Sequence, residues 1–248
     1  MLQFAPEPAV AAGATGQGRR RFNADAYAIY RFPRSSAVGT LGIALFDGIG
    51  DNADIALDAA ILAAAAVRVA ARRDALHGML TATELIADRT VEIPHHDAVG
   101  LVVTIRPDQP AVVASVGDCR AYGFAEGTLT CHTVDATKGN RLRAQEVPED
   151  VASGYDHVPI TTVARATPIT IAILEIVEPV VLLLSDGVYG RLSAQRIGEI
   201  VASHFADPDV CVQALVDAAE AAGAADNATA VVVHRPGFVP TDSTIEGR

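Results

Sequence analysis

The sequence has 248 residues, half of them hydrophobic, and a formal net charge of −11 at pH 7. A chain of this length and composition can bury one large core, so we expect a single main domain. The negative charge argues against a general nucleic-acid-binding protein, because the phosphate backbone would repel it.

Cysteine content and the lack of targeting signals predict a cytoplasmic protein. Cys119, Cys131 and Cys211 match neither a disulfide framework nor a zinc ligand set, so reduced and mostly buried thiols are expected. The apolar run over residues 55–71 is interrupted by two charges, which argues against a membrane span. No basic region precedes an apolar stretch at the N-terminus, so no secretory signal is predicted.

The first third of the chain is predicted to contain an arm, two strands and two helices. Residues 1–18 are rich in Ala, Gly and Pro and show little pattern, which predicts a loose arm. Strands are expected over Asp25–Arg31 and Thr40–Phe46. Residues Asp51–Arg73 are predicted to be helical, because polar positions recur at i, i+4 spacing and the terminal charges match the helix dipole. A second helix is expected over Ala75–Ala87.

The middle of the chain is predicted to be a run of strands followed by a loop. The expected strands are Ala98–Ile105, Ala111–Val116, Arg120–Phe124 and Thr128–Thr133. Glu126-Gly127 is typical of a hairpin turn between the last two. Residues 136–159 lack a clear period, so they are predicted to form a long functional loop.

The last third is predicted to contain two strands, two helices and a final strand. The expected ranges are Ile169–Val177, Val180–Leu184, Ala194–His204, Asp209–Ala222 and Ala228–Val233. Blocks of strands and helices in this order favour a layered α+β domain with antiparallel sheets over a doubly wound parallel fold.

These features divide the chain into three parts. We expect an arm over residues 1–18, a single domain over residues 19–236 and a tail over residues 237–248. The tail ends in Ile245-Glu246-Gly247-Arg248, a protease-recognition sequence used in protein expression, and it is left out of the fold prediction.

Four short stretches with an aspartate lie far apart in the chain, mostly beside apolar runs of strand character. They are Asn23-Ala24-Asp25, Phe46-Asp47-Gly48, Ser185-Asp186-Gly187 and Asp226-Asn227. Each has a simple explanation, because Asp-Gly favours turns, and Asp51 or Asn52 is suited to cap a helix. If strand ends bring the carboxylates together, however, they form a site for hard divalent cations, which prefer oxygen ligands.

In their order, these stretches resemble the motifs of the PPM-type metal-dependent serine/threonine phosphatases, the type 2C protein phosphatase group. The resemblance extends from about Arg20 to Val233. It rests on five motifs, namely Arg20–Asp25, Phe46-Asp47-Gly48, residues 117–122, Leu184–Gly187 and residues 226–229. It implies a four-layer α-β-β-α sandwich in which two antiparallel sheets are flanked by helix pairs.

The resemblance also implies a centre for two metal ions. Asp47, together with the backbone carbonyl of Gly48, would bind both ions. Asp186 and Asp226 would complete the shell of one of them. The implied cofactor is Mn²⁺ or Mg²⁺, and the absence of a clustered Cys/His set argues against zinc.

Further residues are implied around this centre. Asp25 would support the metals through water, and Asp118 matches a position that in some members holds a third ion. Arg20, five residues before Asp25, matches the arginine that holds the phosphate. Arg19 and Arg21 are close enough to leave that choice open.

The implied ligands predict hydrolysis of phosphoserine and phosphothreonine in proteins. Two ions ~3.5–4 Å apart would share a bridging water and lower its pKa, so that hydroxide attacks phosphorus in line. Arg20 would hold the phosphate oxygens with its planar fork.

Three positions depart from the pattern of the family. Ala24 replaces an acidic or amide residue before Asp25, and Ile49 stands where many eukaryotic members have a histidine proposed as general acid. Gly190 stands four residues after Asp186, where members with a third metal commonly have an aspartate. Whether a third ion binds is therefore left open.

Two other functions remain open from the sequence. The chain is alternatively a non-catalytic or weakly active regulatory protein with the phosphatase fold, or a hydrolase of small phosphoesters. For the leading hypothesis the partner is a phosphorylated protein of a bacterial serine/threonine kinase pathway, with no nucleic acid and no membrane. Arg141 and Arg143, in the predicted loop, are candidates for substrate recognition, although loop solubility explains them equally well. The oligomeric state is left open.

Overall fold

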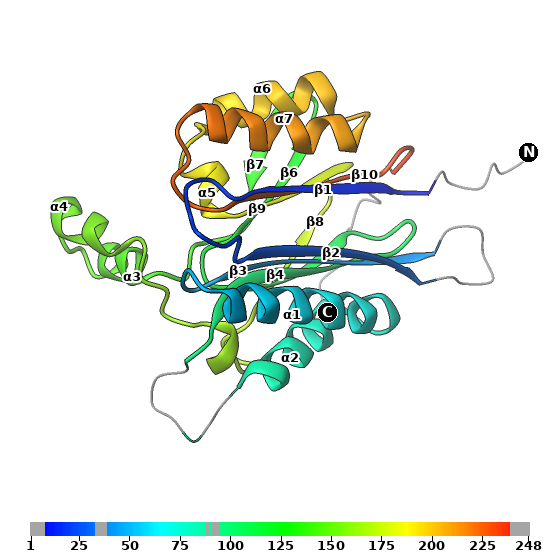
Figure 1. The fold of residues 1–248 in the computed structure, drawn as a ribbon. Coiled ribbons are helices and arrows are strands. Elements are labelled where there is room, and N and C mark those ends of the chain that lie inside the picture. The colour runs from blue at the N-terminus through cyan, green and yellow to red at the C-terminus, as the bar shows by residue number, and fades with distance from the viewer. Residues whose placement is uncertain (1–7, 33–38, 88–89, 91–94, 239–248) are drawn as a thin grey trace, which may run out of the picture.

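The structure, a computed structural model, describes residues 8–32, 39–87, 90 and 95–238. Ten strands in this part of the chain form two five-stranded sheets, and every neighbouring pair is antiparallel. The two sheets lie face to face, and helices cover their outer faces (Figure 1). The predicted α+β sandwich of two antiparallel sheets with flanking helix pairs is confirmed.

The order of the strands differs from their order along the chain. The first sheet has the order β1 (Val10–Gly16), β10 (Ala228–His234), β9 (Val180–Leu184), β6 (Arg120–Ala125) and β7 (Thr128–Cys131). The second has the order β2 (Asp25–Phe32), β3 (Thr40–Gly48), β4 (Ala98–Ile105), β5 (Ala111–Val116) and β8 (Ala172–Ile176). The chain therefore passes from one sheet to the other after β1, β5, β7 and β8. Loops from both sheets meet at shared ends.

Two pairs of long helices cover the sheets, and short helices lie in the connections. The long ones are α1 (Ala53–Arg72), α2 (Ala75–Ile86), α6 (Ala194–His204) and α7 (Pro208–Ala221). The short ones are α3 (Lys138–Ala144), α4 (Glu149–Ala152), α5 (Asp186–Tyr189) and the 3-10 turns η1 (Ser153–Tyr155) and η2 (Val163–Arg165). No helix in the described ranges is both long enough and apolar enough to cross a bilayer.

Three apolar clusters hold the layers together. One lies between the sheets, one between the second sheet and α1 with α2, and one between the first sheet and α6 with α7. Along β3, Ala44 and Phe46 belong to the helix-side cluster, whereas Ile43 and Leu45 belong to the cluster between the sheets. Both faces of this strand are thus buried, which explains why its sequence is a continuous apolar run.

Helix α1 lies so close to β3 that one position on the strand has no room for a side chain. A Cβ atom at Gly42 would lie 2.1 Å from the carbonyl oxygen of Val67 and 2.8 Å from the backbone nitrogen of Ala71. We expect Gly42→Ala to lower the free energy of unfolding by about 2–3 kcal/mol, because backbone atoms cannot move aside as a flexible side chain can. Urea denaturation measures this change. Gly154→Ala is the matched control, since no atom lies within 4 Å of its added Cβ, and equal stability of the two variants would contradict the expectation.

The prediction of a loose arm over residues 1–18 is wrong for β1. This strand pairs with β10 from Val10, opposite His234, to Gly16, opposite Ala228. Gly13 gives room to the ring of Tyr27, whose hydroxyl donates to the Gly13 carbonyl at 2.6 Å. Backbone pairing and this close contact hold the strand in place. Its side chains are small and do not alternate between apolar and polar, so the sequence shows no strand pattern here. Residues 1–7 of the predicted arm lie outside the described residues.

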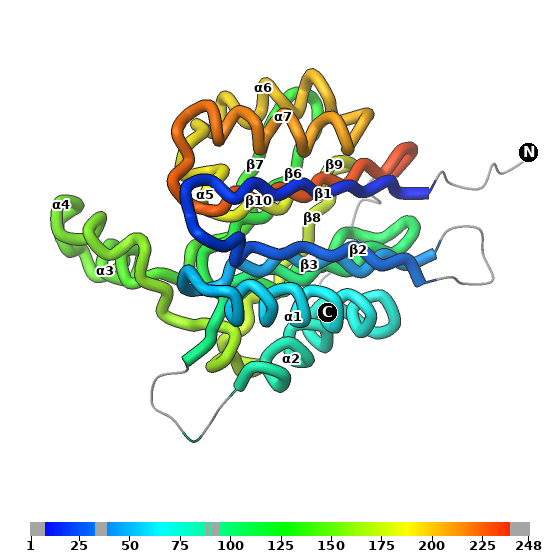
Figure 2. The backbone as a smooth tube through the Cα atoms, in the orientation of Figure 1, coloured from blue at the N-terminus to red at the C-terminus, as the bar shows by residue number. Residues whose placement is uncertain are grey.

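The predicted long loop over residues 136–159 instead contains α3, α4 and η1. This projecting segment extends from one end of the sandwich, as Figures 1 and 2 show. Its helices have seven and four residues, too few for an apolar period. Polar contacts hold it together, because Arg143 bonds both Glu149, at 2.6 Å, and Asp156, at 2.5 Å.

Smaller differences concern the ends of elements and one thiol. The strand predicted from Ile169 begins only at Ala172, because a turn closed by the Thr170 amide and the Thr167 carbonyl precedes it. Cys131 is exposed rather than buried, whereas Cys119 and Cys211 are buried, and all three are free thiols. The other predicted strands and helices lie within about two residues of the observed ones.

Candidate functional site

The five predicted aspartates converge at one end of the two sheets. Asp25 begins β2 and lies directly opposite Asp47 in the register between β2 and β3. Asp186 follows β9, and Asp226 lies two residues before β10 in the other sheet. Asp118 lies in the turn where the chain passes from β5 to β6. The carboxylate of Asp47 is close enough to the other four to interact electrostatically with all of them.

Asp25 is the most buried of these carboxylates and is held by a residue from the other sheet. The Ser185 hydroxyl donates to its Oδ2 atom at 2.8 Å and accepts from the Thr229 amide at 2.9 Å. Its Oδ1 atom is buried and has no partner among the described residues. Burial raises the pKa of Asp25 to about 6. The nearby hydroxyls of Thr229 and Ser185 oppose the rise, and the charges of Asp186 and Asp226 add to it.

The pKa values of three further aspartates are raised for related reasons. Burial and then the charge of Asp25 raise the pKa of Asp47 well above its usual range. Burial and then the charge of Asp226 raise the pKa of Asp186. Burial and then the charge of Asp186 raise the pKa of Asp118 to about 6. The cluster thus repels itself when ionised, and a cation would relieve that repulsion.

The donor set fits a hard divalent cation. Oδ1 of Asp186, like Oδ1 of Asp25, is buried without a hydrogen-bond partner in the described part of the chain. Carboxylates with unused oxygens in a region of mutual repulsion are the ligands that Mg²⁺ and Mn²⁺ prefer. Within the described ranges, no group of three or more His, Cys, Asp or Glu side chains is arranged closely enough to bind a metal ion without rearrangement.

Arg20 is the arginine of its segment that reaches the aspartates. Its Nη2 atom donates to Oδ2 of Asp226 at 2.6 Å. This hydrogen bond is the main cause that raises the pKa of Arg20, and the charges of Asp226, Asp51 and Asp47 add to it. Both groups of the pair are partly exposed, so the guanidinium stays accessible at the edge of the cluster.

The two neighbouring arginines point elsewhere. Arg19 donates to the carbonyl of Gly223 at 3.4 Å. The guanidinium of Arg21 lies 5.8 Å from the centroid of the Phe22 ring. Of the three arginines, Arg20 is thus the one whose side chain bonds an aspartate of the cluster in the described structure.

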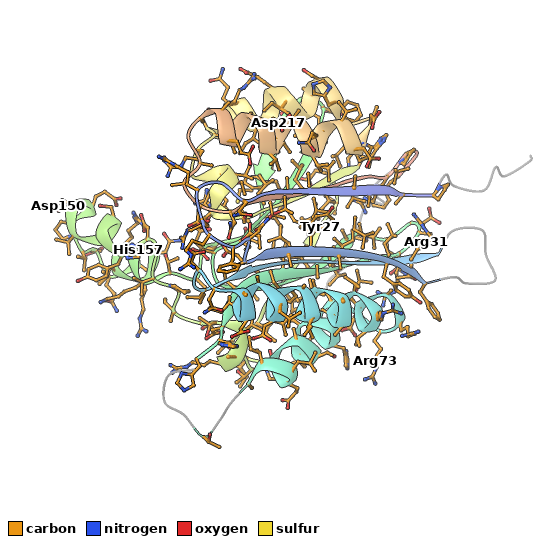
Figure 3. All side chains as sticks on the ribbon, in the orientation of Figure 1. Tyr27, Arg31, Arg73, Asp150, His157 and Asp217 are labelled. Carbon is orange, nitrogen blue, oxygen red and sulfur yellow. The ribbon has the colours of Figure 1, made fainter. Side chains whose placement is uncertain are left out.

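A cleft of about 740 Å³ opens beside the aspartate cluster. Its lining includes Asp118, Asp186 and Asp226 of the cluster and Arg143 and His157 of the projecting segment. Figure 3 shows His157 in this segment, beyond the end of the sandwich. Arg143 is already bonded within the projecting segment, by Glu149 and Asp156, so its predicted role in substrate recognition gains no support. Arg141 does not line this cleft.

An aromatic residue and an ion pair fix the Asp118 turn. Arg120 is bonded to both carboxylate oxygens of Asp135, at 2.7 and 2.9 Å. Its guanidinium lies 3.9 Å from the centroid of the Tyr189 ring. The Tyr189 hydroxyl donates to the carbonyl of Asp118 at 2.9 Å. The sequence does not predict this contact, because nothing local indicates that a residue three positions after Asp186 reaches another turn.

The departures from the motif pattern lie around the cluster. Ala24 is buried, and its carbonyl accepts the amide hydrogen of Gly48 at 3.1 Å. Ile49 is 44% exposed and supplies no acid. Gly190 ends α5, with its amide donating to the carbonyl of Asp186 at 2.7 Å. The five aspartates of the cluster are all present beside these three departures.

Comparison of the sequence with protein-family models and with curated proteins found no match. Solved structures, in contrast, match nearly the whole chain. The serine/threonine phosphatase of S. agalactiae is 20% identical with a TM-score of 0.74, covering 91% of this chain and 99% of its own. The PPM Ser-Thr phosphatase MsPP from Mycobacterium smegmatis, in complex with cacodylate, is 25% identical with a TM-score of 0.69. The coverage is 91% of this chain and 97% of MsPP.

A third match was solved with metal. The catalytic domain of the serine/threonine phosphatase PstP, in complex with two manganese ions, is 21% identical with a TM-score of 0.69, covering 91% of this chain and 97% of its own. The predicted resemblance is confirmed at the level of structure, and the chain has the fold of the PPM-type serine/threonine phosphatases.

Proposed function

We propose that this protein is a manganese- or magnesium-dependent phosphatase that hydrolyses phosphoserine and phosphothreonine in proteins. The observation that carries the proposal is the convergence of five aspartates and one arginine from both sheets beside an open cleft. The fold of bacterial phosphatases supports it, and so does the structure of PstP with two manganese ions.

The described residues suit distinct roles toward the metals. Asp47 and the carbonyl of Gly48 would hold both ions, with Asp186 and Asp226 on one of them. Asp25 would act through water, held in place by its hydrogen bond with Ser185. When bound, the ions supply Lewis acidity that makes a water nucleophilic near neutral pH. Asp118 extends the acidic lining into the cleft and is the candidate for a third ion.

Arg20 is suited to hold the phosphate of the substrate. A guanidinium has five N–H donors, and in the described structure Arg20 makes a side-chain hydrogen bond only with Asp226. The remaining donors form a fork that matches two phosphate oxygens. Asp226 would thus orient the arginine while the fork aligns the phosphate with the metal centre.

Turnover of p-nitrophenyl phosphate and of a phosphothreonine peptide tests the function. We expect hydrolysis of both with added Mn²⁺ and none in EDTA, with the higher kcat/KM for the peptide. No hydrolysis of either substrate would favour a regulatory protein with this fold. Hydrolysis of p-nitrophenyl phosphate alone would favour a hydrolase of small phosphoesters.

Arg20→Ala is expected to lower kcat/KM about 10- to 100-fold, because charged hydrogen bonds to the phosphate are lost. Arg20→Lys should recover part of that loss, since it keeps the charge but not the fork. Steady-state kinetics with Mn²⁺ measures both. Arg19→Ala, next to Arg20 and directed at Gly223, is the control and should retain activity. A larger loss of kcat/KM in Arg19→Ala than in Arg20→Ala would show that Arg20 is not the arginine that holds the phosphate.

A further inference from the structure

Arg20 lies on a stretch of chain that has neither helix nor strand. This crossing segment, residues 17–24, passes from β1 in the first sheet to β2 in the second (Figure 1). Regular hydrogen bonding therefore does not fix its backbone. Since the proposed task of Arg20 requires a defined position, contacts from elsewhere have to hold the segment.

The first sheet holds both ends of the crossing segment through Asn227. Its Oδ1 atom accepts the amide of Ala24 at 2.9 Å. Its Nδ2 atom donates to the carbonyls of Gln17, at 2.8 Å, and Phe22, at 3.1 Å. Within the segment, the Gln17 side chain donates to the carbonyl of Arg20 at 2.9 Å.

The second sheet holds the middle of the crossing segment through Asp51. This residue follows β3 and Gly50, whose φ of +139° lets the chain turn back toward the segment. Oδ1 of Asp51 accepts the amide of Phe22 at 2.9 Å, and Oδ2 accepts the amide of Arg21 at 3.3 Å. These are the two amides that follow Arg20, so one carboxylate fixes the backbone directly beside the arginine.

Asp51 does not serve as the N-cap of α1. Asn52 is the N-cap, and its side chain accepts the amides of Asp54 and Ile55. Asp51 was one of two candidates for that position, but its oxygens are directed at the crossing segment instead. The backbone amides of Phe22 and Arg21 and the nearby charges of Arg20 and Arg21 lower the pKa of Asp51, so it stays ionised at neutral pH.

We propose that Asp51 is the positioning residue for Arg20, holding the crossing segment so that the guanidinium faces the phosphate site. The inference rests on the proposed function, because Arg20 needs a fixed position only if it binds phosphate. Asp51 itself touches neither substrate nor metal in this role. It acts through the amides of Arg21 and Phe22.

Four variants test the inference: Asp51→Ala, Asp51→Asn, Asp54→Ala and Arg20→Ala. Asp54 is the matched control, because it adds the same charge to the start of α1 and is exposed. The readout is the inhibition constant of inorganic phosphate against hydrolysis of p-nitrophenyl phosphate with Mn²⁺. We expect Asp51→Ala to raise it about 5- to 10-fold and Asp51→Asn, which keeps one acceptor oxygen, about 2-fold. Asp54→Ala should leave it unchanged.

A double-mutant cycle separates positioning from a general loss of stability. If Asp51 acts through Arg20, Asp51→Ala raises the inhibition constant less than about 2-fold once Arg20 is already alanine, because the coupled effect is gone. Hydrogen exchange gives a readout independent of turnover. The amides of Arg21 and Phe22 should exchange faster in Asp51→Ala than in wild type and at the wild-type rate in Asp54→Ala.

The outcomes distinguish this inference from the proposed function. A wild-type protein that hydrolyses no phosphoester and is insensitive to phosphate overturns both. An active wild type with a defective Arg20→Ala and a normal Asp51→Ala overturns only the role of Asp51, and so does an equal effect of Asp51→Ala with and without Arg20. If Asp51→Ala does not fold, the same comparisons are made with Asp51→Asn.

Discussion

Asp47→Asn is expected to lower kcat/KM at least about 10³-fold and to make the metal-free protein more stable. Asp47 would hold both ions, so its loss removes the centre of the site. In the metal-free fold, however, burial and four neighbouring carboxylates raise its pKa well above 3.8, which means that its ionised form opposes folding near neutral pH. A neutral amide removes that charge. The variant is therefore expected to have a higher free energy of unfolding than the wild type in the absence of metal.

Two measurements on the same variant test these opposite effects. Activity is measured with p-nitrophenyl phosphate and Mn²⁺, and stability by urea denaturation in EDTA. Asp54→Asn, which removes an exposed charge from the nearby first turn of α1, is the control and should change neither quantity appreciably. Retained activity in Asp47→Asn would refute the metal mechanism. Lower stability in EDTA would show that the carboxylates do not repel one another as placed.

The metal-free protein is expected to lose stability as the pH rises from about 4 to above 6. The folded-state pKa values of Asp25 and Asp118 are raised from 3.8 to about 6. A raised folded pKa means that the native state binds protons more tightly, so this stability is complete below pH 3.8 and lost as the pH passes about 6. For the buried Asp25 the loss is about 2–3 kcal/mol. Carboxylates with lowered pKa values, such as Asp51, change stability only below about pH 4.

Bound metal should reverse this pH dependence. Mn²⁺ replaces the protons on the carboxylates, and a concentration of 100 Kd stabilises the fold by about 2.7 kcal/mol. Urea denaturation at pH 4.5 and 7.5, with EDTA or with Mn²⁺, measures both effects. Asp25→Asn should flatten the dependence in EDTA. A metal-free protein that is as stable at pH 7.5 as at pH 4.5 would contradict the proposed repulsion in the cluster.

Local patterns were enough to predict most of the fold. The apolar runs of β4, β5 and β9 and the alanine-rich α1 gave their ranges almost to the residue, because burial of these elements leaves a strong signal in consecutive residues. The order of five weak motifs then predicted the architecture and the set of aspartates. Strand ends in antiparallel sheets meet at shared edges, which is why Asp25 and Asp47 lie opposite each other.

The sequence could not predict the elements that depend on distant partners. The sequence predicts an arm where strand β1 lies, because the hydrogen bonds of β1 go to β10, more than 200 residues away. The helices of the projecting segment leave no helical pattern in the sequence, because they are short and held by ion pairs. Neither arrangement leaves a period of apolar residues along the chain.

The sequence by itself determined which chemistry this protein has available, namely carboxylates at strand ends and arginines ahead of the first of them. Only the tertiary structure decided which of these groups meet. It favoured Arg20 over its neighbours, tied Asp25 to Ser185 across the two sheets and directed Asp51 at the crossing segment rather than at the helix. The physical reason is that hydrogen bonds and charge interactions act over a few ångströms of space, whatever the distance along the chain.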